Sequence, residues 1–436
     1  MNVVIVNESM PYPPTSGNRI RTLNLMLKLA TRHRLTYIAR ADVGSAETRE
    51  AVAYLAGRGI RTIIADDEAP KRTGAGLYWR LAVNLASRYP YAVSSHNSRG
   101  MRKAILRHAI SEKVDVWQFE WLAYADALHG VSGVRRVIIA HNVESLIWQR
   151  YVQSETNPLK RWYLKQQWRK FHRVEQRLFN EVECVVTVSP EDQQLARDEF
   201  GITHTTVVDN GVDCAYFAEM TRAPERASVL FLGSLDWRPN LDAVTLLLDR
   251  IFPLVREQEP EARLAIVGRR PPAWLVSRVA GMPGVELHAD VPDVRPYLAS
   301  ATAMTVPLRI GGGSRLKILE AMAAGTPVVS SRVGAEGLSV TADEHLKVAD
   351  SAQEHAAMLV QAIRQPGPMA QLADNARRLV RQRYDWESLS RRLEEVWKDL
   401  GRYRMNTDAL AVRQSTDWSV EIEPAEPSII PQSPQG

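Results

Sequence analysis

The chain has 436 residues, of which 45% are hydrophobic and 24% are charged, and its formal net charge is +5. This length is too great for one ordinary hydrophobic core, so two globular domains are expected. The small basic excess suits an anionic substrate or an anionic membrane surface without requiring either, and the absence of a recognition motif or a long basic run argues against a nucleic-acid partner.

The cysteines and the apolar runs exclude further classes of protein. Cys184 and Cys214 are too few for a disulfide framework or a tetrahedral metal site, which favours a reducing compartment. No apolar run approaches the roughly 18 residues of a membrane-spanning helix. The start, MNVVIVNESM, resembles a buried strand more than a secretion signal. We therefore expect a cytoplasmic protein, and peripheral contact with the inner face of the membrane stays open.

Short β-branched runs alternate with longer helical patterns through the first half of the chain. This alternation is typical of parallel βαβ units, so residues 1–218 are expected to form a Rossmann-like domain. The predicted strands are 3–7, 35–39, 62–65, 114–119, 136–142, 184–189 and 205–211.

A polar, proline-containing linker at 219–228 interrupts this alternation. Strand patterns then restart with SVLFLGS, RLAIVG, VELHAD, AMTVPL and PVVSS, which predicts a second Rossmann-like domain over 229–384. An amphipathic pattern predicts a C-terminal helix, 385–404, which we expect to return to the first domain. Residues 405–436 are rich in proline, serine and acid and are predicted to be disordered. The fold class is therefore α/β, with two parallel sheets facing a central cleft.

One loop of the second half places three glycines directly before a helix. Residues 310–327 read IGGGSRLKILEAMAAGTP and follow the strand pattern at 303–308. The loop thus falls at the carboxyl end of a parallel strand, where open α/β sheets bind ligands. Uncovered amide groups and a helix N-terminus favour an anion there, and a diphosphate suits the turn.

The charged residues of this helix strengthen the same interpretation. Arg315 and Lys317 place positive charge where the helix dipole disfavours it, which indicates an anionic ligand. Glu320 lies one and a half turns further on and could accept hydrogen bonds from two adjacent hydroxyls, such as those of a ribose. Together they predict a nucleoside diphosphate across the helix start. On the loop and charges alone, a tight turn with a solvated first turn remains an alternative.

The cassette PLRIGGGSRLKILEAMAAGTPVVSS, followed by VGAEGL, resembles the retaining glycosyltransferases of family 4, which have the GT-B fold. The resemblance covers about residues 1–400 and implies that the C-terminal domain binds a nucleotide-sugar donor and the N-terminal domain an acceptor, with the reaction in the cleft. Further matching segments are PPTSGNRIR at 13–21, AHNVES at 140–145, TVSPED at 187–192, DNGVD at 209–213 and FLGSLDWRPN at 231–240.

The resemblance also implies roles for individual residues. Glu320 takes the position that holds the ribose, and Lys317 and the amides of the glycine loop face the diphosphate and the sugar. Gly17 lets the opposite domain approach the phosphates, and His141 contacts the transferred sugar. The expected catalytic residues are His141, Lys317 and Glu320, and the expected donor-binding residues are Gly17, Arg21, Gly233, Arg238, Gly311, Gly312, Gly313, Ser314, Arg315, Lys317 and Glu320.

Two features depart from the family pattern. Gly312 stands where the family carries a first glutamate, so backbone amides or another residue must contact the donor sugar there. Ser234 and Pro239 stand where many relatives carry an arginine and a lysine that neutralise the diphosphate. The missing charge is expected from Arg238, Arg315 and Lys317.

The expected activity is transfer of a hexose from a nucleotide-diphosphate sugar to a polysaccharide or lipid-linked glycan. Protein cations would stabilise the phosphate charge that grows as the anomeric bond breaks, so neither a metal nor another cofactor is expected. Three alternatives remain: a catalytically silent nucleotide-sugar-binding subunit, which Gly312 favours; a sugar-nucleotide epimerase or a phosphorylase on the same fold; and a nicotinamide-dependent oxidoreductase. The last lacks the expected G-x-G-x-x-G turn after the first strand.

Three other features could contribute to binding. The segment 160–177 carries seven Lys or Arg residues beside one apolar stripe, which fits either a membrane-surface or lipid-acceptor contact, or a core helix with solvated charges. Glu336 and Gly337 are expected to line the cleft. Candidates for stacking on a sugar are Trp79, Trp148 and Trp237.

Overall fold

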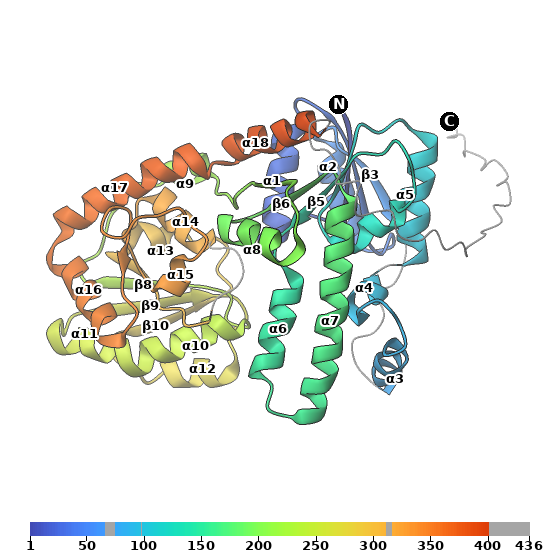
Figure 1. Cartoon of the computed structure of the whole chain (residues 1–436). Coiled ribbons are helices and arrows are strands. Elements are labelled where there is room, and N and C mark those ends of the chain that lie inside the picture. Colours follow the sequence, from blue (N-terminus) through green and yellow to red (C-terminus); the bar gives the residue numbers. More distant parts are fainter. Residues whose placement is uncertain (66–74, 97, 311–315, 401–436) are drawn as a thin grey trace, which may run out of the picture.

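Two parallel sheets form the frame of the molecule (Figure 1). The computed structural model describes residues 1–65, 75–96, 98–310 and 316–400. The first sheet has seven strands in the order β3-β2-β1-β4-β5-β6-β7, and the second has six in the order β10-β9-β8-β11-β12-β13. The α/β class with two parallel sheets is therefore confirmed.

The strands of the first sheet lie where the β-branched runs predicted them. All of their ladders are parallel, so their carboxyl ends meet at one edge of the sheet. The strands are β1 (Asn2–Asn7), β2 (Arg34–Arg40), β3 (Arg61–Ala65), β4 (Val116–Phe119), β5 (Arg136–Ala140), β6 (Cys184–Thr187) and β7 (Thr205–Val207).

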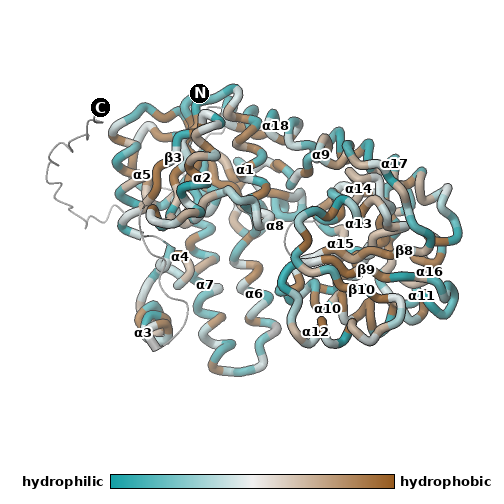
Figure 2. The backbone as a smooth tube through the Cα atoms, turned by 180° about the vertical axis from the view of Figure 1, so that it is seen from behind, coloured by the Kyte–Doolittle hydropathy of each residue, from teal (hydrophilic) through white to brown (hydrophobic). Residues whose placement is uncertain are grey.

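The second sheet follows the same rule, and its central strands are almost fully buried because helices cover both faces. In Figure 2 the tube is mainly brown along β8 and β9, which marks them as hydrophobic. The strands are β8 (Ser228–Leu232), β9 (Arg263–Gly268), β10 (Val285–Ala289), β11 (Ala303–Val306), β12 (Val328–Ser330) and β13 (Lys347–Val348).

Helices of the first half begin at side chains that satisfy free amide groups. The hydroxyls of Ser16, Ser98 and Ser189 each accept a hydrogen bond from the amide three residues on. The helices are α1 (Gly17–Leu29), α2 (Ala46–Ala56), α3 (Ala75–Asn84), α4 (Tyr91–His96), α5 (Arg99–Ser111), the 3₁₀ helix η1 (Leu122–Leu128), α6 (Glu144–Ser154), α7 (Pro158–Glu181), α8 (Pro190–Phe200) and α9 (Cys214–Ala218).

The second half contains shorter helices around its sheet and two long helices at its end. The long pair, α17 (Pro366–Arg383) and α18 (Trp386–Asp399), runs from the second sheet back to the first (Figure 1). The others are α10 (Arg238–Leu246), a π-helical turn (Leu247–Ile251), α11 (Phe252–Gln258), α12 (Ala273–Val279), α13 (Arg295–Ser300), α14 (Leu316–Ala324), α15 (Arg332–Ala335) and α16 (Ala352–Arg364).

Helix α18 belongs to the core of the first sheet. Its apolar face packs in one cluster with residues of β1, β2 and α1. At the edge of this cluster, Arg32 pairs with Glu394 at 2.9 Å. The apolar residues that α18 contributes are Trp386, Leu389, Leu393, Val396 and Trp397.

The chain crosses between the sheets twice, and the two crossings lie side by side. Val212 forms a β-bridge with Asp385, and its amide donates to the Tyr384 carbonyl at 2.9 Å. Beside them, the buried carboxylate of Asp209 accepts a hydrogen bond from Arg392 at 3.1 Å and pairs with Arg383 at 3.4 Å. Two segments about 170 positions apart are thus fixed to each other at one point.

Gly211 allows this close approach. A Cβ atom at this position would lie 2.5 Å from Leu389 Cδ1 and 2.6 Å from Trp386 Cε3, closer than van der Waals contact allows. Only a residue without a side chain lets α18 pack directly on the first crossing.

We expect Gly211→Ala to lower the free energy of unfolding by about 1–3 kcal/mol, because the added methyl group overpacks the junction with α18. The measurement is urea denaturation followed by tryptophan fluorescence. Gly281→Ala is the matched control, since a Cβ there would meet no atom within 4 Å. Equal unfolding midpoints for the two variants would contradict the close-packing argument.

Candidate active site

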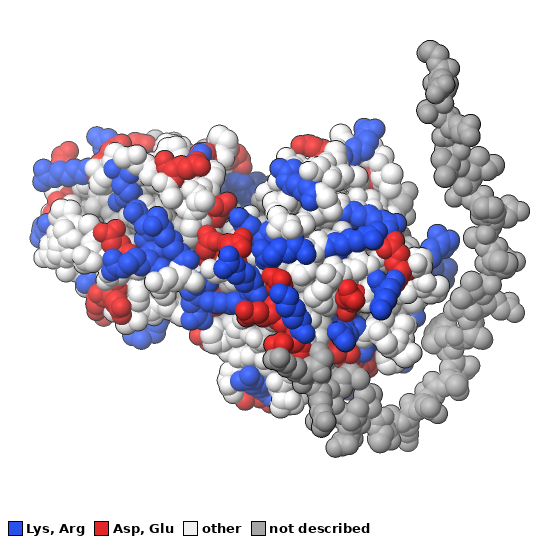
Figure 3. All heavy atoms as spheres, turned by 90° about the horizontal axis from the view of Figure 1, so that it is seen from above, with Lys and Arg blue, Asp and Glu red and all other residues white. Residues whose placement is uncertain are grey.

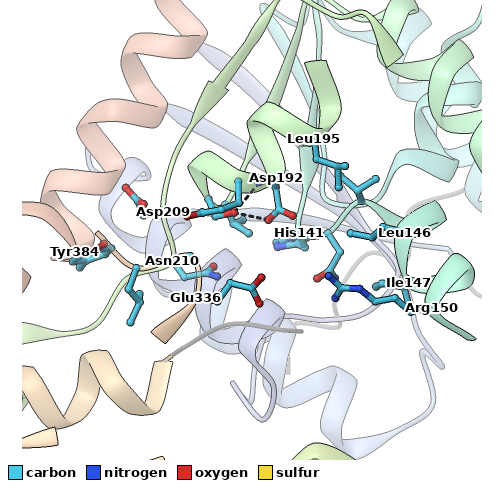
Figure 4. Close-up of a pocket in the computed structure, with 17 residues that line it drawn as sticks. His141, Leu146, Ile147, Arg150, Asp192, Leu195, Asp209, Asn210, Glu336 and Tyr384 are labelled. Carbon is cyan, nitrogen blue, oxygen red and sulfur yellow. Dashed lines mark hydrogen bonds between the residues drawn. The ribbon is translucent and has the colours of Figure 1, made fainter. Parts of the chain in front are cut away.

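A cavity of about 160 Å³ lies between the carboxyl edge of the first sheet and the second half of the chain (Figure 4). Parallel strands bring the loops after β5, β6 and β7 to the same place, and a loop of the second half closes the opposite side. Its lining comprises His141, Asn142, Val143, Leu146, Ile147, Arg150, Val188, Ser189, Glu191, Asp192, Leu195, Asp209, Asn210, Glu336, Gly337, Leu338 and Tyr384.

His141 is held by a buried carboxylate. Its Nε2 atom lies 3.0 Å from Oε2 of Glu120, which is the first residue after β4. The same oxygen accepts from the Thr22 hydroxyl at 3.0 Å. Burial alone would raise the pKa of Glu120, but the hydrogen bond and charge of His141, with the nearby Arg21, outweigh it and lower that pKa. An ionised Glu120 therefore fixes the orientation of the imidazole ring.

Helix α18 reaches this pair through one more side chain. The indole Nε1–H of Trp397 donates to Gln118 Oε1 at 2.9 Å, and the Gln118 amide donates to Glu120 Oε1 at 2.6 Å. Because the oxygen of Gln118 faces a donor-only indole, its NH₂ group must face Glu120. Three hydrogen bonds thus connect α18 with His141.

Carboxylates from both halves of the chain face the cavity. Burial raises the pKa of Asp192; the hydrogen bond from Ser189 and the charge of Arg150 oppose this, whereas Glu191 and Glu336 add to it. In Figure 4 the side chains of Asp192 and Glu336 lie on opposite sides of the same space. Such oxygens accept hydrogen bonds from hydroxyl groups, so this lining suits a sugar.

Gly337 brings the second half against the first. Its φ of +80° is in the left-handed region, and a Cβ there would lie 3.4 Å from Ser189 Cβ at the start of α8. Glu336 and Gly337 therefore line the same cavity as His141.

The residues that line the cavity form one cluster of candidate site residues. A second cluster lies at the carboxyl end of β8, where α10 and α14 begin. The Lys317 amine donates to Asn240 Oδ1 at 2.8 Å and lies 4.9 Å from the centre of the Phe231 ring. The Asn240 amide in turn donates to the Ser234 carbonyl at 2.9 Å. A Cβ on Gly233 would lie 2.9 Å from the Lys317 amine, so this glycine leaves room for the lysine. Asn240 therefore sets the position of a cation at the end of the sheet.

Glu320 lies one turn beyond Lys317 on α14. Its carboxylate is half-buried and makes no hydrogen bond or ion pair with another residue that the structure describes. Burial raises its pKa, and the charge of Lys317 partly offsets the rise. Its negative charge also contributes to the raised pKa of Tyr216 on α9, after burial and Asp293. A carboxylate in this state is a ready acceptor for the hydroxyls of a ligand.

Arg21 has a structural position that its motif did not predict. Its guanidinium is buried and donates to the carbonyls of Asp209 and, at 2.8 Å, Val208. Burial lowers its pKa to about 10 against the opposing charges of Glu120 and Asp209. In this structure Arg21 therefore supports the segment that lines the cavity, and its direct contact with the donor stays a prediction.

The remaining expected donor contacts are less defined. Gly17 is the first residue of α1, and Arg238 is the exposed first residue of α10. Of the tryptophans proposed for stacking, Trp148 instead packs on Phe171, with ring centres 5.4 Å apart. The expected contacts that lie outside the described residues are Gly311, Gly312, Gly313, Ser314 and Arg315.

Sequence reasoning missed four residues that the structure places at these sites. Glu120 follows a predicted strand directly, and a carboxylate at a strand end was the available signal. Asn240 closes the segment FLGSLDWRPN, and Asp192 closes TVSPED. Arg150 lies outside every motif singled out in the sequence, and it reaches the cavity because α6 begins beside it.

No group of three or more His, Cys, Asp or Glu side chains among the residues that the structure describes is placed to hold a metal ion. Within the same residues we find no helix whose length and hydrophobicity would let it span a bilayer.

The fold and the two clusters define a GT-B glycosyltransferase, and comparison with known families agrees. Residues 20–216 match the family described as "Glycosyltransferase Family 4", and residues 226–365 match "Glycosyl transferases group 1". The chain belongs to the group 1, family 4 glycosyltransferases.

Individual proteins show the extent of the similarity. The glycogen synthase of Mycobacterium tuberculosis is 28% identical over 244 residues, which are 52% of this chain and 57% of that protein. The sucrose-phosphate synthase of Thermosynechococcus elongatus superposes with a TM-score of 0.67 at 17% identity, over 92% of this chain and 99% of that one. Anabaena HepE in complex with UDP-glucose gives a TM-score of 0.63 at 15% identity, over 92% and 100%. The sequence match thus spans little more than half of the relative, whereas the fold matches almost completely.

Two glutamates, Glu144 and Glu175, lie close together at the start of α6, beside the cavity. Glu175 of α7 accepts hydrogen bonds from the amides of Glu144, at 2.6 Å, and Ser145, at 2.9 Å, and so caps α6. Burial, with the charge of Glu8, raises the pKa of Glu144 to about 7, and burial raises that of Glu175 to about 7. Folding therefore holds protons on these groups that the unfolded chain loses above pH 4.5.

From this we predict that the contribution of Glu144 and Glu175 to the free energy of unfolding falls as pH rises from about 4.5 to about 7, because the native state holds protons on them that the unfolded state releases in that window. Buried histidines with lowered pKa values, such as His355 at about 4, act in the opposite direction, so the effect is read from the difference between variants. Glu144→Gln should make this fall smaller, since the amide has no charge to bury. Urea denaturation at pH 5 and pH 8 measures the difference. The control is Glu257→Gln at an exposed position of α11; an equal pH dependence in all three proteins would count against a raised pKa.

Glu120→Gln should lower the turnover of a nucleotide sugar about tenfold or more, because the His141 ring loses its ionised partner. Nucleotide affinity should change little, since Glu120 belongs to the first half of the chain. Steady-state kinetics and a binding titration separate the two effects. Thr22→Val is the control, because it removes the other partner of the same oxygen and keeps the contact with His141. Unchanged turnover, or equal loss of turnover and affinity, would refute the positioning role.

Proposed function

We propose that this chain transfers a hexose from a nucleoside diphosphate sugar to a hydroxyl of a polysaccharide or lipid-linked glycan, with retention of configuration at the anomeric carbon. One observation carries the proposal: Lys317 and Glu320 lie one turn apart on the same helix, at the carboxyl edge of a parallel sheet. The amine suits the diphosphate and the carboxylate suits the ribose.

The proposed chemistry needs little from the protein beyond charge and orientation. As the bond between the anomeric carbon and the phosphate oxygen breaks, negative charge grows on the phosphate, where Lys317 would stabilise it; removal of such a donor costs about 3–4 kcal/mol. The acceptor oxygen then bonds to the anomeric carbon on the same face. Its proton passes to the departing phosphate oxygen, so no side chain has to act as a strong base.

The acceptor is proposed to occupy the cavity on the side of the first sheet. There Asp192 and Glu336 offer oxygens to sugar hydroxyls, and Arg150 offers donors. His141, held by Glu120, would contact the transferred sugar between the two clusters. We place the reaction in the cytoplasm, with the acceptor presented at the membrane surface.

The donor is best identified by a thermal-shift screen with UDP, GDP, ADP and dTDP and their sugars. The UDP-glucose complex of HepE makes uridine nucleotides the first to test. A rise in melting temperature with one nucleotide would support the proposal. No rise with any of them would refute a nucleotide site at Lys317. Tight binding without turnover would favour the silent nucleotide-sugar-binding subunit, the second candidate suggested by Gly312.

Glu320→Ala should weaken nucleotide binding about tenfold, the loss typical of a hydrogen bond to a charged group. The melting temperature of the free protein should stay nearly constant, because this carboxylate makes no hydrogen bond or ion pair with a described residue. Glu257→Ala, at an exposed site on α11, is the control. A large loss of melting temperature with unchanged affinity would show that Glu320 is structural.

Lys317→Ala should reduce kcat more than it reduces nucleotide affinity, because the amine meets charge that develops only in the transition state. Asn240→Ala should give a weaker form of the same effect, since it keeps the amine and removes one of its hydrogen bonds. Steady-state kinetics with the identified donor provide the test. Equal loss in both parameters would assign Lys317 to simple binding.

A further inference from the structure

A second cavity, of about 600 Å³, lies at the amino edge of the second sheet. Its lining includes Ala227, Thr302 and Pro327, the residues directly before β8, β11 and β12. Because these strands are parallel, the cluster around Lys317 lies at the opposite edge of the sheet. The cavity is therefore separate from the candidate active site, and its volume is within the range of about 300–1,000 Å³ that is typical of small-molecule sites.

Arg222, in the linker between the two halves, lines this cavity and is held by neutral oxygens. Its Nη1 donates to the carbonyls of Leu298 and, at 2.9 Å, Ala301. The same atom donates to the Thr326 hydroxyl at 3.1 Å. All the hydrogen bonds that Arg222 makes with described residues use Nη1, so its Nε and Nη2 groups stay available to a ligand.

Arg377 of α17 brings a second guanidinium to the same cavity. Its Nη2 donates to the Ala324 carbonyl at 3.0 Å, and its Nε is buried without a hydrogen-bond partner among the described residues. Gly325 leaves room for this side chain, because a Cβ there would collide with the guanidinium. The φ of Gly325, +73°, also favours glycine. The end of α14 is thus shaped around Arg377.

The two guanidinium groups are close enough to repel each other. Burial and the charge of Arg377 lower the pKa of Arg222 to about 10, and no described carboxylate opposes this shift. Glu225 and Asp374 also line the cavity, but neither arginine forms an ion pair with a residue that the structure describes. Two half-buried like charges without a counter-ion are costly, which indicates a place for an anion.

Pairing with carboxylates is otherwise common in the second half of the chain. Arg295, Arg309 and Arg332 each pair with an aspartate within 3.1 Å. Figure 3 likewise shows basic and acidic side chains intermixed on one face of the molecule. The lack of such a partner at Arg222 and Arg377 is therefore a local feature of this cavity.

The rest of the lining is mainly apolar. It comes from the linker and from the facing ends of α16 and α17. A bare inorganic ion would leave this surface in contact with water, whereas a ligand with an apolar group would cover it. The apolar side chains include Met220, Pro224, Ile363, Pro366 and Met369.

We propose that this cavity binds a small phosphorylated ligand, with its phosphate between Arg222 and Arg377 and an apolar group against Met220 and Met369. Guanidinium groups bind phosphate oxygens through paired hydrogen bonds. A phosphate monoester carries a charge of about −1.5 to −2 near pH 7, so it neutralises two guanidinium groups better than a single carboxylate does. This site is distinct from the donor site at Lys317 and does not rest on the proposed function.

Isothermal titration calorimetry of the full chain with phenyl phosphate, at constant ionic strength, tests the proposal. The parent protein should bind phenyl phosphate more tightly than inorganic phosphate, and should bind phenol at least about tenfold more weakly, because phenol lacks the charged group. Arg377→Gln should weaken phenyl phosphate binding about tenfold or more. Arg378→Gln is the matched control, since it removes the same charge from an exposed position of α17 outside the cavity lining.

A second pair of variants leaves the charges unchanged. Ala370→Trp fills part of the cavity from an exposed position, so it should weaken phenyl phosphate binding about tenfold and inorganic phosphate binding less. Gln371→Trp, at the next exposed position and outside the lining, should bind like the parent. Thermal melts check the folding of every variant, and the tryptophan pair decides the question if Arg377→Gln does not fold.

Three results would overturn the proposal: no binding of phenyl phosphate by the parent, equal affinities in Arg377→Gln and Arg378→Gln, or binding that is lost in Lys317→Ala and kept in Arg377→Gln. The last would assign the anion to the donor cluster. Nucleotide thermal shifts should be the same in the parent and in Arg377→Gln, so failure of this site is distinguishable from failure of the proposed function.

Discussion

The pairing of the two chain crossings is the contact on which the rest of the structure depends. Val212 and Tyr384 join the crossings through backbone, and the buried Asp209 carboxylate draws Arg383 and Arg392 onto the same point. A buried carboxylate requires such partners, because an unpaired charge there would be costly. Asp209 also lines the cavity. The contact that holds the two sheets together therefore also sets one wall of the candidate site.

The same constraint connects the last helix with the chemistry. Once the second crossing returns the chain to the first sheet, α18 completes the core around β1 and α1. Trp397 then lies within hydrogen-bond distance of Gln118, and through Glu120 the helix orients His141. A buried network of this kind is rigid only if its members are satisfied, and here the donors of Trp397, Gln118 and Thr22 each have an acceptor. The position of His141 thus depends on Trp397, a residue of α18 that is distant in the sequence.

Local patterns predicted the fold well, and long-range contacts limited the prediction of the site. Strands follow from β-branched runs, and the positions of Lys317 and Glu320 on one helix face follow from their spacing. The partners of these residues do not: 21 positions separate Glu120 from His141, and 77 separate Asn240 from Lys317. Such pairs form only because β4 lies beside β5 and β8 beside β11, and no sequence period encodes strand order. The motif containing Arg21 likewise gave no indication that its side chain is buried.

Helix α7 shows why two interpretations of one segment were both needed. Its 24 residues span about 36 Å, whereas the five-residue strand β5 spans about 17 Å. A helix this long cannot be covered by the sheet along its whole length, so part of it must overhang. The covered turns bury Phe171 and Leu178, as a core helix does. If water were the partner of the overhang, polar residues would suffice there, but the overhang carries Leu159 and Trp162 beside a basic stripe. The core-helix interpretation therefore describes the covered turns of α7, and the membrane-surface interpretation stays a prediction for its first turns.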